Sequence, residues 1–215
     1  MIFRKDLDNR LYEIEPDIDM DNIEEINAFL NEQNTSQSDL EFIYVPDEEL
    51  PDNIYPITEA LYKINSDTQE IELDVERMLS EYKQSLISSV NNTRDFYIAS
   101  GFDWTRTTTD TDGNQIETTY HFGLTQDYIN GMLSLATAVL LGKTTDLYFI
   151  TTDNITVDNL TPEEVTDLAL TGEAQASYII YQARQYKDAI AAASSFDELY
   201  QLLTAMKEEA GESGF

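Results

Sequence analysis

Residues 74–122 read DVERMLSEYKQSLISSVNNTRDFYIASGFDWTRTTTDTDGNQIETTYHF, and this stretch contains two different periodicities. From 74 to 97, apolar residues recur at spacings of three and four, which is typical of one face of a long amphipathic helix. After Gly101, threonine and aromatic residues dominate, and these residue types favour β-strands. A long helix followed directly by strands predicts an α+β fold.

The apolar face of the predicted helix is a narrow stripe. Its members are Val75, Leu79, Tyr82, Leu86 and Val90. A stripe of this width can pack against the remainder of its own domain, or it can be the contact surface of a coiled coil. It spans only about two to three heptads, fewer than a coiled-coil assignment requires. The sequence therefore favours packing within the domain and leaves open a role as an interaction stripe.

The strands that follow are predicted to form a β-hairpin over about 103–122. Gly113 and Asn114 tolerate positive φ, so the segment 110–114 suits a tight turn. An EF-hand calcium loop is the alternative for this acidic segment, but such a loop has glycine at its sixth position and a helix on each side. Here the glycine is the fourth residue and strands flank it, so we expect a turn and no metal site.

Capping signals predict three further helices. The first covers 125–141, and the other two begin at the capping boxes 161–164 and 195–198, in which the first and fourth side chains satisfy each other's backbone N–H groups. We expect the second of these helices to end near residue 193 and to be loosened at Gly172. The residues predicted to face inward on the first are Ile129, Met132, Leu133, Ala136 and Leu140.

The N-terminal part, residues 1–73, has a different pattern and is predicted to be a small, mostly β module. Hairpins are expected over 2–15 and 61–73, a strand over 40–45, and a short helix over 21–30 that is followed by a polar loop. The predicted organisation is thus the acidic module 1–73, a helical domain with the β-hairpin over 74–208, and a tail over 209–215. No internal repeat is evident.

The charge of the chain excludes several kinds of partner. It has 12 lysines and arginines against 42 aspartates and glutamates, a formal net charge of −30. Direct binding to nucleic acid or to an anionic membrane surface requires clustered cations, so neither is expected. No apolar run is long enough for membrane insertion. Mimicry of DNA phosphates by the carboxylates is a remote alternative that remains open.

The residue inventory also argues against catalysis. The chain has no cysteine and a single histidine, His121, which excludes disulfides, thiolate metal sites and multi-histidine metal sites. The sequence has no serine-containing nucleophile motif for which His121 could act as the catalytic base. It also has no glycine-rich phosphate-binding loop. Trp104 beside the hairpin is predicted to be a core anchor. We therefore expect no enzyme activity, no catalytic residues, no cofactor and no metal.

The order of motifs in the C-terminal part resembles a domain of unknown function that occurs at the C-terminal end of many bacteriophage tail and tail-fibre-associated proteins. The resemblance covers about residues 75–208. In order, the matching motifs are Gly101-Phe102, His121-Phe122-Gly123, Gln126-Asp127-Tyr128-Ile129-Asn130-Gly131, Tyr148-Phe149, Thr152-Asp153-Asn154, Leu160-Thr161-Pro162-Glu163-Glu164-Val165, Ala183-Arg184, Lys187-Asp188-Ala189-Ile190 and Phe196-Asp197-Glu198-Leu199.

This resemblance implies a non-enzymatic virion protein, a structural tail component such as a tail-fibre adaptor or fibre-associated subunit. An assembly chaperone for tail fibres is the alternative. The implied partners are other phage tail or tail-fibre proteins, and a homo-oligomer such as a trimer. The implied location is the tail of the virion, after synthesis in the host cytoplasm.

Overall fold

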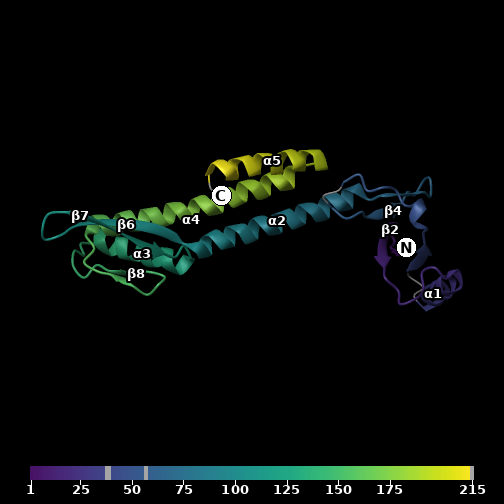
Figure 1. Cartoon of the computed structure of the whole chain (residues 1–215), viewed down its shortest axis with the longest axis horizontal. Coiled ribbons are helices and arrows are strands. Elements are labelled where there is room, and N and C mark those ends of the chain that lie inside the picture. Colours follow the sequence, from purple (N-terminus) through teal and green to yellow (C-terminus); the bar gives the residue numbers. More distant parts are fainter. Residues whose placement is uncertain (37–39, 56–57, 214–215) are drawn as a thin grey trace. The chain divides into compact units, whose positions relative to one another are not determined.

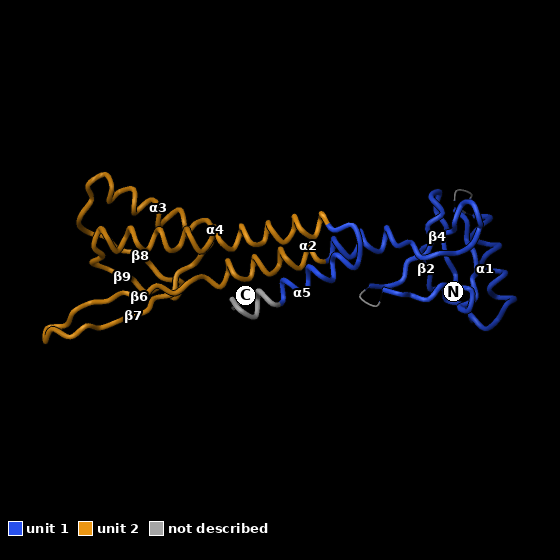
Figure 2. The backbone as a smooth tube through the Cα atoms, turned by 90° about the horizontal axis from the view of Figure 1, so that it is seen from above, with its two compact units in different colours: residues 1–85, 193–215 blue, residues 86–192 orange. Residues whose placement is uncertain are grey.

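The computed structural model describes residues 1–36, 40–55 and 58–213, and confirms the mixed α+β class (Figure 1). The chain forms two compact units (Figure 2): unit 1 consists of residues 1–85 and 193–215, and unit 2 of residues 86–192. The sequence analysis placed a domain boundary after residue 73, where the predicted β module ends and the predicted helix begins. That boundary stays a prediction. Among the described residues, no helix combines the length and the apolar character that a membrane span requires.

Within the described residues of unit 1, five antiparallel strands form one sheet in the order β3-β1-β2-β4-β5. The strands are β1 (Ile2–Lys5), β2 (Arg10–Ile14), β3 (Glu41–Tyr44), β4 (Tyr62–Ile64) and β5 (Ile71–Leu73). Both predicted hairpins and the predicted strand at 40–45 are confirmed. Asn9 has a φ of 61° and lies in the first turn, as expected for a residue type that tolerates this conformation.

Helix α1 (Ile23–Ser36) is longer than the sequence predicts. The side chain of Asn22 accepts a hydrogen bond from the backbone N–H of Glu24 and so begins the helix. The polar segment 31–38 was predicted to be a loop; this prediction is wrong for residues 31–36, which are helical, and residues 37 and 38 lie outside the described residues. Asn34 in the last turn explains the difference, since its amide makes two hydrogen bonds with the backbone of Phe42 in β3, at 2.7 and 3.0 Å.

Helix α2 (Val75–Ser100) begins in unit 1 and continues into unit 2. In unit 1 the last helix, α5 (Phe196–Ser213), completes the fold. Phe196 stacks on Tyr55 with ring centroids 4.4 Å apart, and Leu199 is fully buried. Because α5 continues to Ser213, most of the segment predicted as a tail over 209–215 is helical, and residues 214–215 lie outside the described residues. A 3-10 turn covers Asp47–Glu49.

Unit 2 joins a hairpin, a small two-stranded sheet and two packed helices. Its elements are β6 (Phe102–Thr109), β7 (Gln115–Phe122), α3 (Gln126–Leu140), β8 (Phe149–Ile150), β9 (Thr156–Val157) and α4 (Pro162–Ala192). The hairpin is confirmed, with Gly113 at a φ of 87° in its turn. Phe102 and Phe122 at the base of the hairpin are buried, and Phe122 also contacts Phe149 of β8.

The capping box predicted at 161–164 is confirmed at the start of α4. The Thr161 N–H donates to Glu164 Oε2 at 2.7 Å, and the Glu164 N–H donates to Thr161 Oγ1 at 3.2 Å. At the start of α5, the Glu198 N–H donates to Ser195 Oγ, but the Glu198 carboxylate bonds to Ser194 instead of Ser195. The N-termini of both helices are therefore satisfied by nearby side chains.

Two details of the helix predictions are wrong. Helix α4 is continuous at Gly172, which is buried and allows a close approach: an added Cβ would lie 2.9 Å from Met132 Sδ and 3.2 Å from the Phe102 ring. Gly172 is thus a packing residue and not a point of loosening. On α3, Ile129 and Met132 are buried as predicted, whereas Leu133 is 40% exposed and Leu140 is 83% exposed.

Candidate interaction surfaces

The predicted interaction stripe lies along α2, and all five of its members, Val75, Leu79, Tyr82, Leu86 and Val90, are half-buried. Tyr82 is 6.1 Å from Phe196 of α5, ring centre to ring centre, so this part of the stripe packs inside unit 1. The fully buried residue of the helix is Met78, which the stripe did not include. Packing within the chain accounts for part of the stripe, and its role in binding stays a prediction.

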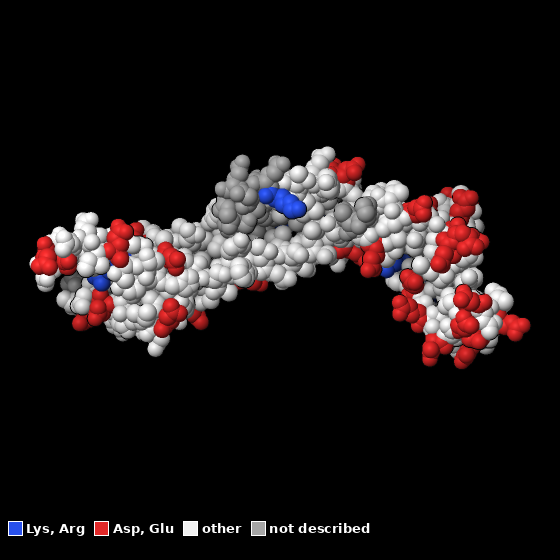
Figure 3. Space-filling model, viewed as in Figure 1, with Lys and Arg blue, Asp and Glu red and all other residues white. Residues whose placement is uncertain are grey.

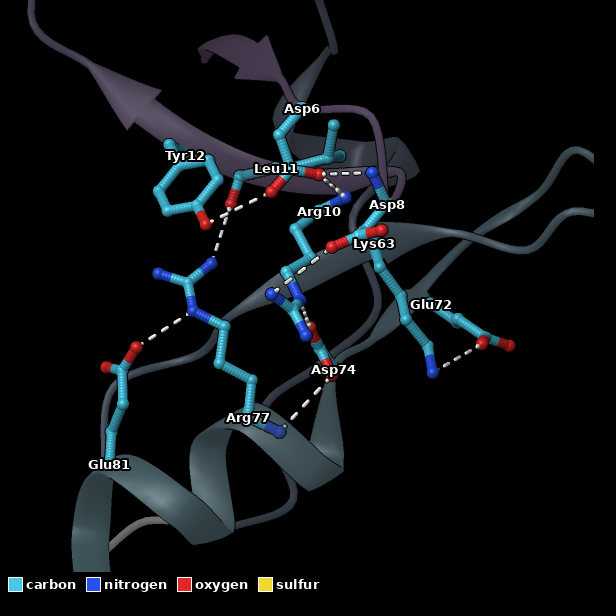
Figure 4. Close-up of polar contacts among 10 residues, drawn as sticks. All are labelled: Asp6, Asp8, Arg10, Leu11, Tyr12, Lys63, Glu72, Asp74, Arg77 and Glu81. Atoms are coloured by element: carbon cyan, nitrogen blue, oxygen red, sulfur yellow. Dashed lines mark hydrogen bonds and ion pairs between the residues drawn. The ribbon is translucent and has the colours of Figure 1, made fainter. Parts of the chain in front are cut away.

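The start of α2 is fastened to the sheet of unit 1 by a polar network (Figure 4). The Arg77 guanidinium lies 4.2 Å from the centre of the Tyr12 ring and donates to the Leu11 carbonyl and to Glu81. Asp74 precedes the helix, and its Oδ1 accepts from the Arg77 N–H at 3.3 Å. These contacts connect the first turns of α2 to strand β2, so the network is suited to anchoring the helix on the sheet.

Burial of Asp74 is the unusual feature of this network. Its side chain is 5% exposed, and its Oδ2 has no hydrogen-bond partner. Arg10 Nε lies 3.9 Å from that oxygen, close enough for an ion pair but too far for a hydrogen bond. Nearby, burial opposes ionisation of Asp6, but hydrogen bonds from the backbone of Arg10 and Asp8 outweigh it and lower the pKa of Asp6.

In unit 2, polar side chains fasten the hairpin to α4. Trp104 is 6% exposed, and its Nε1 donates to Asp167 Oδ2 at 2.8 Å, which confirms it as a core anchor. Arg106 donates to both carboxylate oxygens of Glu164, at 2.8 and 3.2 Å, and to two backbone carbonyls of the β9–α4 connection. Burial opposes ionisation of Glu164, but the Arg106 and Thr161 hydrogen bonds outweigh it, so the pKa of Glu164 is lowered.

The His121 side chain contacts an acidic residue on the neighbouring strand. Its Nδ1 lies 2.7 Å from Asp103 Oδ1 on the neighbouring strand; the Asp103 side chain is exposed and the His121 side chain is half-buried. Its backbone carbonyl accepts a hydrogen bond from the Thr152 N–H. In the described part of the chain, no three His, Cys, Asp or Glu side chains come close enough together to hold a metal ion. The polar contacts around His121 therefore connect β7 to its neighbours.

Two open grooves cross the surface of unit 2. The first, of about 570 Å³, lies between α3 and the segment 143–150, with Tyr128, Leu135 and Phe149 along it and Asp127 beside them. The second, of about 490 Å³, lies between α2, α3 and α4 and is lined by Ile98, Leu133, Ile180 and eight further residues. Both grooves have largely apolar linings, which suits contact with other apolar surfaces better than chemistry on a small polar substrate.

The outward side of α4 is the surface that sequence reasoning missed. Three large residues lie exposed there: Leu170 at 62%, Tyr178 at 45% and Tyr181 at 58%. The signal was present in the sequence, because residues 174–183 contain no charged residue in a chain with 42 carboxylates. In Figure 3, acidic side chains gather over the N-terminal sheet and α1, and further acidic side chains lie over the end of unit 2 that holds the hairpin, α3 and β8.

A family model for a domain of unknown function, DUF4376, matches residues 81–208. The chain belongs to this family. The DUF4376 domain includes all of unit 2 and continues into α5 of unit 1, so it contains both grooves and the outward side of α4. This match confirms a domain of unknown function in the region that the motif order identified. Neither the curated proteins nor the solved structures gave a match.

Proposed function

We propose that the protein is a non-enzymatic structural component of a bacteriophage tail, a fibre adaptor or fibre-associated subunit that acts through protein–protein contacts. The observation that carries this proposal is the order of motifs over 75–208, which resembles a domain at the C-terminal end of phage tail proteins. The DUF4376 match falls on the same residues. The proposed partners are other tail or tail-fibre proteins, and the proposed location is the tail of the virion.

The surface of the DUF4376 domain supports a contact-based role. Protein–protein contact surfaces are enriched in aromatic and aliphatic side chains and depleted of charge at their centres. Unit 2 exposes Leu140, Leu170 and Tyr181 to at least 58% each, although the chain is strongly acidic. Such residues are costly to leave in water over a large area, and a permanent neighbour would cover them.

Quantitative mass spectrometry of gradient-purified phage particles tests this proposal. We expect a defined copy number in multiples of three or six, with an abundance relative to the major tail protein that is constant between preparations. An abundant host protein that co-sediments weakly serves as the control for contamination.

Two other outcomes would contradict a structural role. Expression in infected cells together with absence from particles would favour the assembly chaperone. Capture of a host DNA-binding protein by the isolated chain, lost at high salt, would favour mimicry of DNA by its carboxylates.

A further inference from the structure

The groove between α3 and the segment 143–150 has the edge of a strand as one of its walls. We name it the α3–β8 groove. Gly131, Ser134 and Leu135 of α3 line one side of it, and Tyr148, Phe149 and Ile150 line the other. Successive side chains of an extended strand point to opposite faces, so three consecutive residues line one groove only where it runs along the strand's edge. The groove therefore follows the backbone of β8.

Within the described part of the chain, this edge of β8 has no neighbouring strand. On its other side β8 pairs with β9, and the Leu147 carbonyl and the Thr151 N–H form hydrogen bonds on that side, at 3.0 and 2.9 Å. Hydrogen-bonding directions alternate along a strand, so the N–H and C=O groups of Tyr148 and Ile150 point away from β9. Unpaired backbone groups at an exposed edge are a template for an added strand.

The length of the groove suits an extended segment of about five residues. From Asp127 to Ala138 the groove follows α3 for about three turns, or about 17 Å, and an extended chain rises about 3.3 Å per residue. Alternate side chains of an added strand would point towards Leu135 and the Phe149 ring, which are half-buried. Apolar side chains at these alternate positions would be removed from water there.

Charge selects the kind of segment. The groove contains two carboxylates, Asp127 and Asp146, and one ammonium group, Lys143, all on exposed residues. The whole chain has a net charge of −30, so an acidic segment is repelled and a basic one is attracted. A second copy of the chain is poorly suited to the groove for the same reason, since it has 42 acidic against 12 basic residues.

We propose that the α3–β8 groove binds an extended segment of another protein, which adds to β8 as a third strand and has alternating apolar and basic residues. Hydrogen bonds to the backbone of Tyr148 and Ile150 hold the segment, and the apolar floor selects its side chains. Tyr148 and Ile150 are 54% and 42% exposed, and the added strand covers part of both. This inference depends on the geometry of unit 2 and applies to a tail subunit and to a chaperone alike.

Hydrogen exchange followed by NMR tests the backbone contact. The probe is a panel of seven-residue peptides with valine, isoleucine or tyrosine at alternating positions and lysine between them. A peptide of this panel should slow the exchange of the Tyr148 and Ile150 amide hydrogens at least tenfold, and should change that of Phe149, which already faces β9, much less. If no peptide of the panel binds, or if binding leaves the Tyr148 and Ile150 amides unprotected, the inference is overturned.

Two changes to the peptides test charge and strand addition separately. Peptides with glutamate in place of lysine should bind at least tenfold more weakly. Methylation of alternate backbone nitrogens removes the N–H groups on one edge of the peptide, so only one of the two alternating sets should abolish binding. Equal binding of the lysine and glutamate peptides, or equal effects of the two methylated sets, would contradict the proposal.

A substitution in the groove shows where the peptide binds. Ser134→Tyr places a ring in the groove from an exposed position of α3, so the fold should be retained and the peptide should bind at least tenfold more weakly. Thr137→Tyr is the matched control, at an exposed position of the same helix outside the α3–β8 groove, and should leave the affinity unchanged. Equal affinities of the two variants would overturn the inference. Self-association that protects the Tyr148 and Ile150 amides without peptide would assign the groove to a second copy instead.

Discussion

The sheet of unit 1 and helix α4 of unit 2 differ in the kinds of side chain that they expose to the solvent. Residues 1–80, which form that sheet and α1, carry 22 acids against 5 bases. On α4, large uncharged residues such as Leu170 and Tyr181 are exposed together with the carboxylates of Glu163, Asp167, Glu173 and Asp188. The first surface is thus strongly acidic, whereas the second combines large uncharged side chains with a few carboxylates. This difference favours the proposal that contacts with other proteins are made by unit 2.

The cores of the two units differ as well. The sheet of unit 1 encloses a small cluster around Phe3, Leu11 and Val45. Unit 2 has an aromatic cluster at the base of its hairpin, where Trp104 and Phe122 are in ring contact, and α3 and α4 pack beside it. Trp104 is the only tryptophan of the sequence and lies in unit 2, so its fluorescence reports on that unit alone.

Removal of the Phe3 ring should have the largest effect and should be confined to unit 1. Phe3 is 2% exposed and contacts Tyr62 edge to face, so Phe3→Ala should cost about 3–5 kcal/mol of folding free energy. Circular dichroism should report loss of strand structure while the Trp104 transition remains near its natural midpoint. A parallel loss of both signals would show that the two units unfold together.

Gly172→Val should destabilise unit 2, whereas Phe3→Ala should destabilise unit 1. The added side chain would meet Met132 and the Phe102 ring, and overpacking of this kind costs about 1–3 kcal/mol. The Trp104 unfolding transition should shift to lower denaturant concentration. Gln175→Val, at an exposed position of the same helix, controls for β-branching and should cost only a few tenths of a kcal/mol. Equal shifts for the two variants would rule out close packing at Gly172.

Arg106→Met should weaken the attachment of the hairpin to α4 by about 1.5–3 kcal/mol at neutral pH, because Glu164 is left partly buried without its charged partner. The pKa of Glu164 is lowered in the folded chain, so this stabilisation is complete above the ordinary glutamate pKa and is lost as the pH falls through the lowered value. The unfolding free energies of the natural chain and of Arg106→Met should therefore become equal in acid.

Arg184→Met is the control for this change, since Arg184 and Asp188 form an exposed ion pair 3.7 Å apart. It should change the unfolding free energy by no more than about 0.5 kcal/mol. A difference between the natural chain and Arg106→Met that does not depend on pH would contradict the role given to Glu164.

Asp74→Ala should have the smallest effect, about 1 kcal/mol, through loss of the side-chain hydrogen bond at the start of α2. Asp74→Ser retains a capping oxygen and should be closer to the natural chain in thermal unfolding followed by circular dichroism. If serine is no better than alanine at this position, then capping is not the contribution of Asp74.

Local signals made most of the elements predictable, and long-range contacts explain the errors. The capping box at 161–164 and the turn with Asn9 depend on neighbouring residues, so the sequence specifies them. The extension of α1 depends on Asn34 meeting Phe42 of β3, which no local pattern reveals. The closeness of Gly172 to Phe102 also requires the packed helices. The outward side of α4 was missed because periodicity identifies the buried side of a helix, whereas Leu170 and Tyr181 lie exposed on another side.

The salt dependence of self-association is the most direct test of which surface makes the contacts: the outward side of α4 or the acidic surface of residues 1–80. Raising the salt from about 0.01 M to 1 M shortens the Debye length from about 30 Å to 3 Å and screens the repulsion between two acidic chains. Sedimentation velocity of the full chain should show stronger association at high salt if the outward side of α4 is the contact. Association that weakens as salt is added would mean that charged groups make the contact, and it would contradict this account.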